Sequence, residues 1–269
     1  MIIFKSINRL NKEVNFKANI GFVPTMGALH KGHFSLIKSS KKKCKKTLVS
    51  IFVNPSQFNK KNDYKNYPRN LKRDIKILKM LKVDYLLIPK INEIYKNKKT
   101  MKIKLNREDK ILCVKYRPGH FEGVLAIINQ FLINIKAKFM FLGEKDYQQI
   151  HLLKKFIKSK FKTKIIPCKT VRLNNSLAYS SRNFLLSKNE IQKASLISNS
   201  VRNFYLSIKK NFRNKNNINE IKKNIESKRI KVDYFELRNK KNLSKKIDKN
   251  NFKIFIAYYI NNIRLIDNF

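Results

Sequence analysis

Short apolar runs alternate with amphipathic segments through the first 168 residues of this 269-residue chain, and this alternation is the strongest constraint on its fold. The runs interpreted as strands are residues 19–24, 47–53, 85–88, 139–142 and 164–166. Between them, apolar residues recur every three or four positions, which is typical of helices packed by one face. Repeated strand–helix units predict an α/β domain with a Rossmann-like parallel sheet, in which ligands bind at the carboxyl ends of the strands.

The remainder of the chain has a different pattern. All six glycines and all six prolines lie at or before Pro167. Ser187 with Glu190 three residues later forms a capping-box pattern, which predicts a long helix up to about Ile208. A solvated loop is predicted at Lys209–Asn217. Further strands are predicted at residues 232–237, 254–260 and 263–266.

These two patterns predict two domains. Residues 1–170 form the Rossmann-like domain, and residues 171–269 form a smaller α+β domain. No internal repeat is evident.

The chain is unusually basic. It has 62 Lys and Arg residues, 17 acidic residues and a net charge of +45. Such a charge raises nucleic acid as a partner, and a basic nucleic-acid-binding protein is one alternative. However, the basic residues are mostly lysines spread over the whole chain, together with abundant Asn, Ile and Phe. We interpret this composition as drift in an AT-rich genome, and we expect no specific nucleic-acid partner.

The hydropathy pattern and the cysteines favour an intracellular, soluble protein. No apolar run approaches the roughly 18 residues that a membrane span needs. The N-terminal run Met1–Phe4 is also too short for a signal peptide. Cys44, Cys113 and Cys168 are widely separated and odd in number, so we predict buried, unpaired cysteines.

Two of the four histidines lie between the first predicted strand and the helix that follows. His30 and His33 stand one helical turn apart, and Gly27 and Gly32 allow the backbone to approach a ligand. A helix start offers free N–H donors and a positive dipole end, which suit phosphate. Two imidazoles there could stabilise charge on a leaving pyrophosphate. The alternative is a pair of capping or core histidines.

Polar groups also follow the second strand and precede a later helix. Asn54 and Gln57 are two-sided hydrogen-bonding groups suited to a hydroxylated substrate, although an Asn-Pro turn is the alternative. Arg117 or His120 could face an anion, or this segment could be a loop with a helix cap.

Charged residues at three further places are candidates. Lys145 could reach a nucleotide phosphate, with Asp146 on a metal or ribose and Gln149 facing the cleft, unless this is only a charged turn. Ser180–Arg182 could clamp phosphate or cap a helix. Asp74 could contribute to Mg²⁺ binding through water or form a helix ion pair. The sequence contains neither a P-loop motif nor GxGxxG.

Taken in order, these motifs resemble those of the pantothenate synthetase (pantoate–β-alanine ligase) family of the HxGH nucleotidyl-transferase superfamily. The matching segments are PTMGALHKGH at 24–33, SIFVNPSQF at 50–58, YPRNLKRD at 67–74, RPGHFEGV at 117–124, FLGEKDYQQ at 141–149, SSRN at 180–183 and RLIDN at 264–268. The resemblance implies a cytoplasmic homodimer that uses ATP and Mg²⁺. It implies that pantoate is first converted to pantoyl-adenylate with release of pyrophosphate, and that β-alanine then displaces AMP.

The resemblance also implies roles for individual residues. His33 is implied as the proton donor, with His30 assisting and Lys145 completing the catalytic set. Residues implied to contact ATP are Met26, Gly27, Ala28, Leu29, His30, Lys31, Gly32, His33, Gly143, Glu144, Lys145, Asp146, Val171, Tyr179, Ser180, Ser181 and Arg182. Residues implied to lie at pantoate are Gln57, Gln149, Asn54 and His120, and Asp74 is a weaker Mg²⁺-linked candidate.

Three positions depart from the family pattern. Arg73 stands where some relatives are acidic, Tyr179 replaces Leu or Met, and Asn175–Ser176 replaces Asp-Gly, which would stiffen that turn. The remaining alternative enzyme is another HxGH nucleotidyl transferase. The Gln57 and Gln149 pair argues against it, because two amides suit a neutral hydroxylated substrate better than a phosphorylated one.

Overall fold

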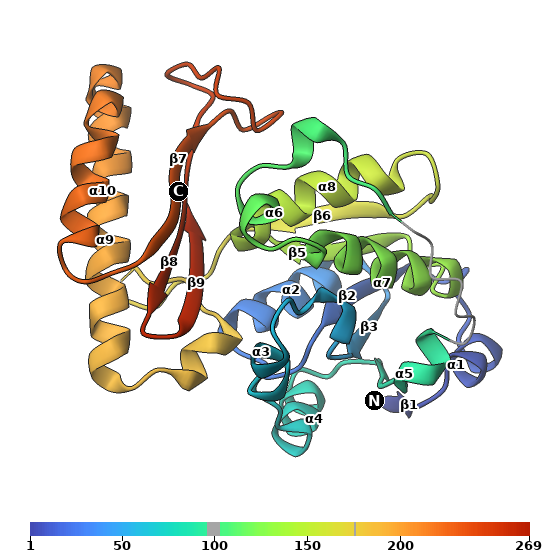
Figure 1. Ribbon diagram of the computed structural model, residues 1–269. Helices are drawn as coiled ribbons and strands as arrows, with labels where there is room; N and C mark the ends of the chain where they lie inside the picture. The colour runs from blue at the N-terminus through green and yellow to red at the C-terminus, as the bar shows by residue number, and fades with distance from the viewer. Residues whose placement is uncertain (96–102, 175) are drawn as a thin grey trace. The chain divides into compact units, whose positions relative to one another are not determined.

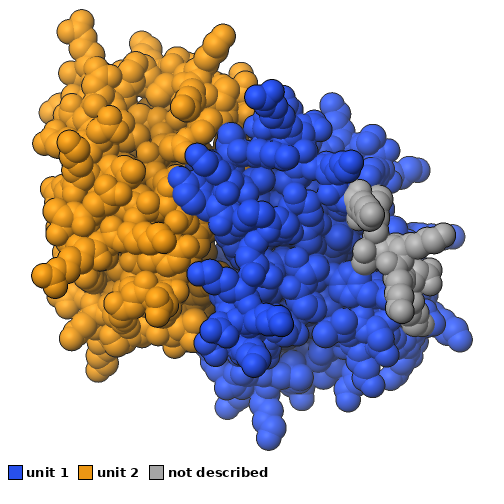
Figure 2. Space-filling view, in the orientation of Figure 1, with its two compact units in different colours: residues 1–144, 149–169 blue, residues 145–148, 170–269 orange. Residues whose placement is uncertain are grey.

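The computed structural model describes residues 1–95, 103–174 and 176–269, and these residues form two compact units. Unit 1 contains residues 1–144 and 149–169, and unit 2 contains residues 145–148 and 170–269 (Figure 2). The short segment 145–148 therefore belongs to unit 2, although both of its sequence neighbours belong to unit 1.

Unit 1 is built on a parallel sheet that has six strands within the described residues (Figure 1). In order across the sheet, the strands are β1 (Ile2–Phe4), β4 (Tyr85–Leu87), β3 (Lys46–Ile51), β2 (Ile20–Thr25), β5 (Phe139–Gly143) and β6 (Lys164–Cys168). The helices of this part of the chain are α1 (Ile7–Glu13), α2 (Lys31–Lys43), α3 (Lys61–Lys65), α4 (Leu71–Met80), α5 (Ile91–Ile94), α6 (Cys113–Tyr116), α7 (His120–Asn134) and α8 (Tyr147–Ile157). The predicted Rossmann-like parallel sheet is confirmed.

The core of unit 1 explains why these segments form strands and crossover helices. Each of four adjacent strands contributes a fully buried side chain to one cluster, with α2 and α4 packed against them. These residues are Val23, Val49, Leu86 and Phe141 from the strands, and Ile37 and Leu78 from the helices. Strands buried in this way read as continuous apolar runs, which is why the sequence pattern located them.

The strand order reverses between β2 and β5. From β2 the chain proceeds to β3 and β4 on one side, and then returns to β5 and β6 on the other. Gly21 and Phe22 of β2 pair with Phe139 and Met140 of β5. In open parallel sheets, the carboxyl ends of the two strands flanking such a reversal form the ligand-binding crevice. The turns after β2 and β5 are therefore the first places to look for a site.

Unit 2 contains an antiparallel sheet of β7 (Val232–Arg238), β8 (Lys253–Ile260) and β9 (Ile263–Asn268). Figure 1 shows α9 (Lys188–Lys210) and α10 (Ile218–Glu226) side by side along one face of this sheet. The Ser187 capping box is present, because its hydroxyl accepts the Glu190 N–H at 3.3 Å and the Glu190 carboxylate accepts the Ser187 N–H at 2.7 Å. The prediction of a smaller α+β region is confirmed.

Two parts of the sequence prediction need correction. The predicted loop Lys209–Asn217 is wrong, since α9 continues to Lys210 and a 3-10 helix follows at Phe212–Asn217. Packing explains the difference, because the Phe212 ring lies 5.9 Å from the Phe252 ring, centroid to centroid, and orders a polar segment. The sequence analysis also missed α10 and the short β1 with its following helix α1.

Two simpler expectations concern the cysteines and membrane spans. Cys44, Cys113 and Cys168 are buried and none of them forms a disulfide, as predicted. Within the described ranges, no helix is both long enough and apolar enough to cross a bilayer.

Candidate active site

The two histidines of the HxGH motif lie at the start of α2, directly after β2. His30 is the N-cap residue of α2, and its Nδ1 accepts the Gly32 N–H at 3.1 Å. The His33 Nδ1 accepts the His30 N–H at 3.3 Å, and the two ring centroids lie 4.1 Å apart. Because each Nδ1 accepts a hydrogen bond, the proton of each neutral imidazole resides on Nε2. Both rings therefore carry an Nε2–H donor whether they are neutral or charged.

The backbone N–H groups that precede α2 are already engaged. The Gly27 N–H donates to Thr25 Oγ1 at 3.2 Å, and the Ala28 and Leu29 N–H groups each donate to Asp74 at 2.8 Å. The sequence analysis expected free N–H donors at the helix start, and there the Gly32 N–H likewise already donates to His30 Nδ1. The His30 and His33 Nε2–H groups are therefore the candidate donors of this segment to a phosphate.

Asp74 is a buried carboxylate in the first turn of α4, and its residue is only 1% exposed. Its Oδ2 accepts the Ala28 N–H and its Oδ1 accepts the Leu29 N–H. Burial raises the pKa of the Asp74 carboxyl, while the two N–H bonds and the Arg73 charge act in the opposite direction. Across the described parts of the chain, no three or more His, Cys, Asp or Glu side chains group as metal ligands.

Gln57 ends a 3-10 helix, Pro55–Gln57, that follows β3. Its amide Nε2 donates to the Met26 sulfur at 2.9 Å, and its Oε1 accepts from Asn54 Nδ2 at 3.2 Å. The structure thus brings Gln57 to the turn that carries the histidines. A thioether is a weak acceptor, so a substrate oxygen could take this N–H instead.

Asn54 and Tyr95 hold this 3-10 helix in place. Asn54 is 1% exposed, and its Nδ2 also donates to the Gly123 carbonyl at 3.1 Å. The Tyr95 hydroxyl donates to Asn54 Oδ1 at 2.5 Å, and burial raises the Tyr95 pKa. Asn54 is therefore committed to contacts within the chain. Sequence reasoning missed Tyr95, because a single tyrosine in a short helix carries no periodic or motif signal.

His120 and Arg117 support the backbone of Gln57. The Gln57 carbonyl accepts from His120 Nδ1 at 2.7 Å, and Arg117 Nη1 donates to His120 Nε2 at 3.0 Å. Gly123 is needed here because a Cβ at this position would overlap the Ser56 carbonyl group. The RPGHFEGV motif therefore fixes the segment that presents Gln57.

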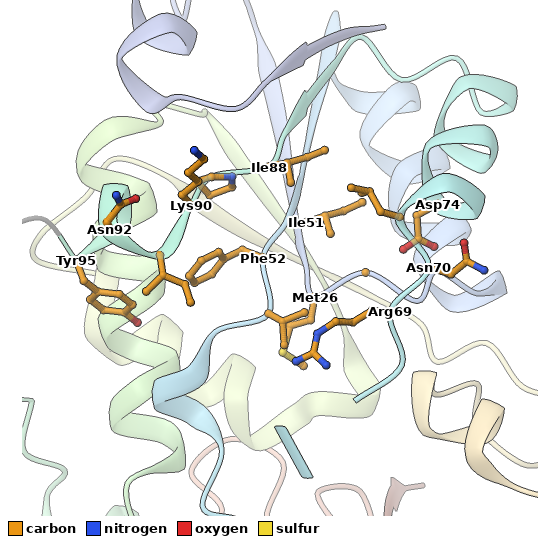
Figure 3. Close-up of a pocket in the computed structure, with 15 residues that line it drawn as sticks. Met26, Ile51, Phe52, Arg69, Asn70, Asp74, Ile88, Lys90, Asn92 and Tyr95 are labelled. Atoms are coloured by element: carbon orange, nitrogen blue, oxygen red, sulfur yellow. The ribbon is translucent and has the colours of Figure 1, made fainter. Parts of the chain in front are cut away.

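We call residues 26–33, which connect β2 to the first turn of α2, the histidine turn. A pocket of about 790 Å³ opens beside it within unit 1. Figure 3 shows Asp74 and Asn70 on one side of it, Tyr95 and Asn92 on the other, and Met26 between them. The remaining lining is largely apolar and comes from residues Gly27, Ile51, Phe52, Val53, Arg69, Leu71, Ile88, Pro89, Lys90 and Ile91. The carboxyl ends of β3 and β4 form its wall.

The turn after β5 divides between the two units. Gly143, Glu144 and the half-buried Gln149 belong to unit 1, whereas Lys145 and Asp146 belong to unit 2. The Lys145 carbonyl accepts from Asn268 Nδ2 at 2.9 Å. Two residues further along the chain, the Tyr147 hydroxyl donates to the Lys240 carbonyl at 2.9 Å, and its ring lies 5.8 Å from that of Phe255.

The remaining predicted site residues come together in unit 2. The Tyr179 N–H donates to the Val171 carbonyl at 3.0 Å, which closes a small hairpin. Ser180 follows as the cap of a 3-10 helix and accepts the Arg182 N–H at 3.2 Å, while Ser181 is buried. Ser180 therefore caps a helix, which was the alternative to a phosphate clamp. This cap fixes the segment that leads to Arg182.

The tip of this hairpin contains the departure noted above. Asn175 lies outside the described residues, but Ser176 adopts φ of +70°, a conformation that favours glycine. Arg172 Nη1 donates to the Ser176 carbonyl at 2.8 Å and pairs with Asp267 through two bonds of 2.6 and 2.9 Å. Sequence reasoning gave Arg172 no role, because its partner lies 95 residues away.

Comparison with known proteins assigns this site to a family. The family model described as pantoate-beta-alanine ligase matches residues 2–269. The chain belongs to this family. It is similar to the pantothenate synthetase of Francisella tularensis subsp. novicida, with 42% identity over 274 residues that cover 100% of this chain and 97% of that protein. The alternatives of another nucleotidyl transferase or a nucleic-acid-binding protein are not favoured.

Solved structures of the family have the same fold. One is a pantoate-beta-alanine ligase from Francisella tularensis complexed with beta-gamma ATP and beta-alanine. It has a TM-score of 0.87 and 39% identity, covering 100% of this chain and 97% of that one. The pantothenate synthetase of Thermus thermophilus has a TM-score of 0.90 and 27% identity, covering 100% of this chain and 99% of that one.

Proposed function

We propose that this protein condenses pantoate with β-alanine to form pantothenate, using ATP and passing through pantoyl-adenylate. The observation that carries the proposal is the imidazole pair at the start of α2, next to the strand reversal of a parallel sheet. Family membership over residues 2–269 supplies the substrates. The likeness to a ligase structure with an ATP compound and β-alanine supports the same two ligands here.

In the first half-reaction, an oxygen of the pantoate carboxylate attacks the α-phosphorus of ATP, and the bond to pyrophosphate breaks. The Nε2–H groups of His30 and His33 donate hydrogen bonds that stabilise the negative charge developing on the leaving pyrophosphate, and His33 acts as donor through this bond while its Nε2 keeps the proton. Lys145 adds a positive charge at the phosphates. Because each histidine is fixed through its Nδ1, no reorientation is needed as the charge develops.

In the second half-reaction, the amine of β-alanine attacks the acyl carbon of pantoyl-adenylate. An amide bond forms, the acyl–phosphate bond breaks, and AMP leaves with its phosphate charge. Gln57 and Gln149 hold the pantoyl group through neutral amides, and Asn54 and His120 maintain the position of Gln57. No covalent enzyme intermediate is required, so catalysis consists of positioning and charge stabilisation.

The residues that the resemblance assigns to ATP include a group within unit 2. Support for this comes from the hairpin that brings Val171 and Tyr179 together and leads through Ser180 and Ser181 to Arg182. The remaining contacts proposed for ATP are made by residues Met26–His33 and Gly143–Asp146.

The proposal also includes Mg²⁺ and the oligomeric state of the protein. Mg²⁺ is part of the proposal as the counter-ion that would offset the charge of the ATP phosphates, and the described residues contain no group of three or more His, Cys, Asp or Glu side chains that would hold it. The family resemblance supports a cytoplasmic homodimer. Light scattering coupled to size-exclusion chromatography tests the dimer, because a mass of about 64 kDa is expected from two 32.0 kDa chains.

The decisive experiment measures the two half-reactions separately. Pyrophosphate release from ATP and Mg²⁺ is followed with and without pantoate, and AMP release is then followed after β-alanine is added. Pantoate-dependent pyrophosphate followed by β-alanine-dependent AMP is expected. Pyrophosphate release without pantoate would indicate a different transferase, and a folded protein with no turnover would contradict the proposal.

A further inference from the structure

Asp74 connects α4 to the turn that carries the histidines. Its two oxygens accept the N–H groups of Ala28 and Leu29, each at 2.8 Å. These partners lie 46 and 45 residues away in the sequence. Asp74 is 1% exposed, so both bonds are shielded from water and cannot readily be replaced by solvent.

The backbone of this turn has an unfavourable conformation. Gly27 has φ of +78° and Ala28 has φ of +49°, so two consecutive residues are left-handed. Alanine is disfavoured there because its Cβ crowds the following carbonyl oxygen. Such turns direct successive N–H groups toward one point and create a concavity that binds an anion. In this protein the Asp74 carboxylate occupies that concavity.

The fit around the carboxylate is close. A Cβ added at Gly27 would lie 3.0 Å from Asp74 Oδ2 and 3.2 Å from the Ile51 side chain. The other groups of the turn bond locally, since Gly27 donates to Thr25 and His30 donates to His33. Asp74 is thus an anchor from a distant element, and it holds the two residues immediately before His30.

We propose that Asp74 is a positioning residue for the first half-reaction: its carboxylate holds the turn before α2 in the shape that aims His30 and His33. This inference rests on the proposed function. It differs from the role of Asp74 as an Mg²⁺ ligand, because here the carboxylate acts through the backbone N–H groups that each of its oxygens accepts. The two roles predict different responses to Mg²⁺ and to the backbone of residue 28.

The test compares Asp74→Asn with Asp84→Asn in the full-length protein. Asp84 is a matched control in unit 1, since it also accepts a backbone N–H, from Thr47 at 2.9 Å, and bonds to Lys46 at 2.8 Å. It does not contact the histidine turn. Asparagine keeps the shape of aspartate but removes the charge and presents an N–H group to one of the two N–H donors.

Asp74→Asn is expected to slow pantoate-dependent pyrophosphate release about tenfold or more, because one of the two bonds is lost and the other no longer has a charged acceptor. AMP release from preformed pantoyl-adenylate and β-alanine should change less than about threefold, since no pyrophosphate leaves in that step. Asp84→Asn should leave both rates within about twofold. Raising the Mg²⁺ concentration should not restore the Asp74→Asn rate.

A second substitution separates positioning from a general loss of structure. Glycine adopts positive φ without strain, so Ala28→Gly added to Asp74→Asn should recover part of the pyrophosphate-release rate. If Asp74→Asn alone does not fold, the double variant is compared with Ala28→Gly, and its pyrophosphate release should still be slower.

Three results would overturn the inference. They are equal losses in both half-reactions, equal losses in Asp74→Asn and Asp84→Asn, and restoration of the rate by Mg²⁺. Failure of the wild-type protein to release pantoate-dependent pyrophosphate would instead contradict the proposed function, so the two outcomes are distinguishable.

Discussion

The turns after β2 and β5 are held in place in different ways. The first is fixed inside unit 1 by the buried Asp74 carboxylate, which accepts two N–H bonds. The second carries Lys145, whose carbonyl accepts one bond from the neutral amide of Asn268 in the last strand of unit 2. Hydrogen bonds to a charged group contribute about 1.5–3 kcal/mol, against about 0.5–1.5 kcal/mol for neutral ones.

The two turns therefore differ in which unit of the protein keeps them in position. The histidine turn is preorganised by the unit that contains it, so its geometry does not require unit 2. The turn after β5, which we call the lysine turn because it carries Lys145, is held by Asn268 of β9. Its position therefore depends on the stability of unit 2. The following variants test this contrast, beginning with the largest expected effect.

Arg172→Ala should destabilise unit 2 by about 3–5 kcal/mol, because it leaves the buried Asp267 carboxylate without its partner. Asp267 directly precedes Asn268, so the anchor of Lys145 should be lost with it. Urea unfolding followed by circular dichroism measures the change. The exposed pair Lys222–Glu226 is the control, and Lys222→Ala should cost less than about 0.5 kcal/mol. Equal effects of the two substitutions would contradict the assigned importance of Arg172.

His33→Ala should reduce pyrophosphate release by about 10²–10³-fold, since a preorganised donor to the leaving group is removed. Folding should change little, because its hydrogen bond to His30 is local. The rate is measured with saturating ATP and pantoate, and the melting temperature is measured in parallel. His151→Gln serves as a control outside the site and should retain most of the activity. A folded His33→Ala enzyme with near-normal turnover would exclude the proposed role.

Lys145→Ala should slow the first half-reaction by about 10- to 100-fold, less than loss of His33, because a flexible ammonium acts as a point charge. AMP release from preformed pantoyl-adenylate should fall less. Single-turnover kinetics of each half-reaction provide the comparison. Equal losses in the two steps would show that Lys145 acts on binding common to both.

Asn268→Ala should have the smallest effect, a loss of about 1 kcal/mol or roughly fivefold in pyrophosphate release. The matched control is Lys253→Met, which removes the ammonium that donates to Asn268 Oδ1 and lies 5.1 Å from the Tyr147 ring, but leaves the bond from Asn268 to Lys145. Its rate should stay closer to that of the wild type. If Asn268→Ala is as harmful as Lys145→Ala, the lysine turn is held by Asn268 more strongly than a single neutral bond implies.

The sequence was sufficient for the parallel sheet and for the position of the histidines. Buried strands such as β3 appear as uninterrupted apolar runs, and the HxGH spacing places both imidazoles on one helical turn. The local pattern failed where polar segments are ordered by distant packing, as in the 3-10 helix at Phe212–Asn217, whose Phe212 ring packs near that of Phe252.

Within the site, the sequence indicated candidate groups but not what each side chain contacts. Asp74 was a candidate for Mg²⁺ because carboxylates favour that ion, yet its partners are two N–H groups from a turn 45 residues away. The anchor of Lys145 was equally hidden, since Asn268 lies 123 residues further along the chain. Contacts between residues so far apart in the chain produce no periodic pattern in the sequence, so they could not be predicted from it.

The assignment of residues 145–148 to unit 2 has a consequence for any attempt to divide the molecule. The border between the units crosses the chain three times, between residues 144 and 145, 148 and 149, and 169 and 170. Cleavage at the last crossing gives an N-terminal fragment with the whole histidine turn, but also with four residues that belong to the fold of the other fragment. The N-terminal fragment would therefore carry residues 145–148 without their contacts, such as the bond of the Lys145 carbonyl with Asn268 and that of the Tyr147 hydroxyl with Lys240.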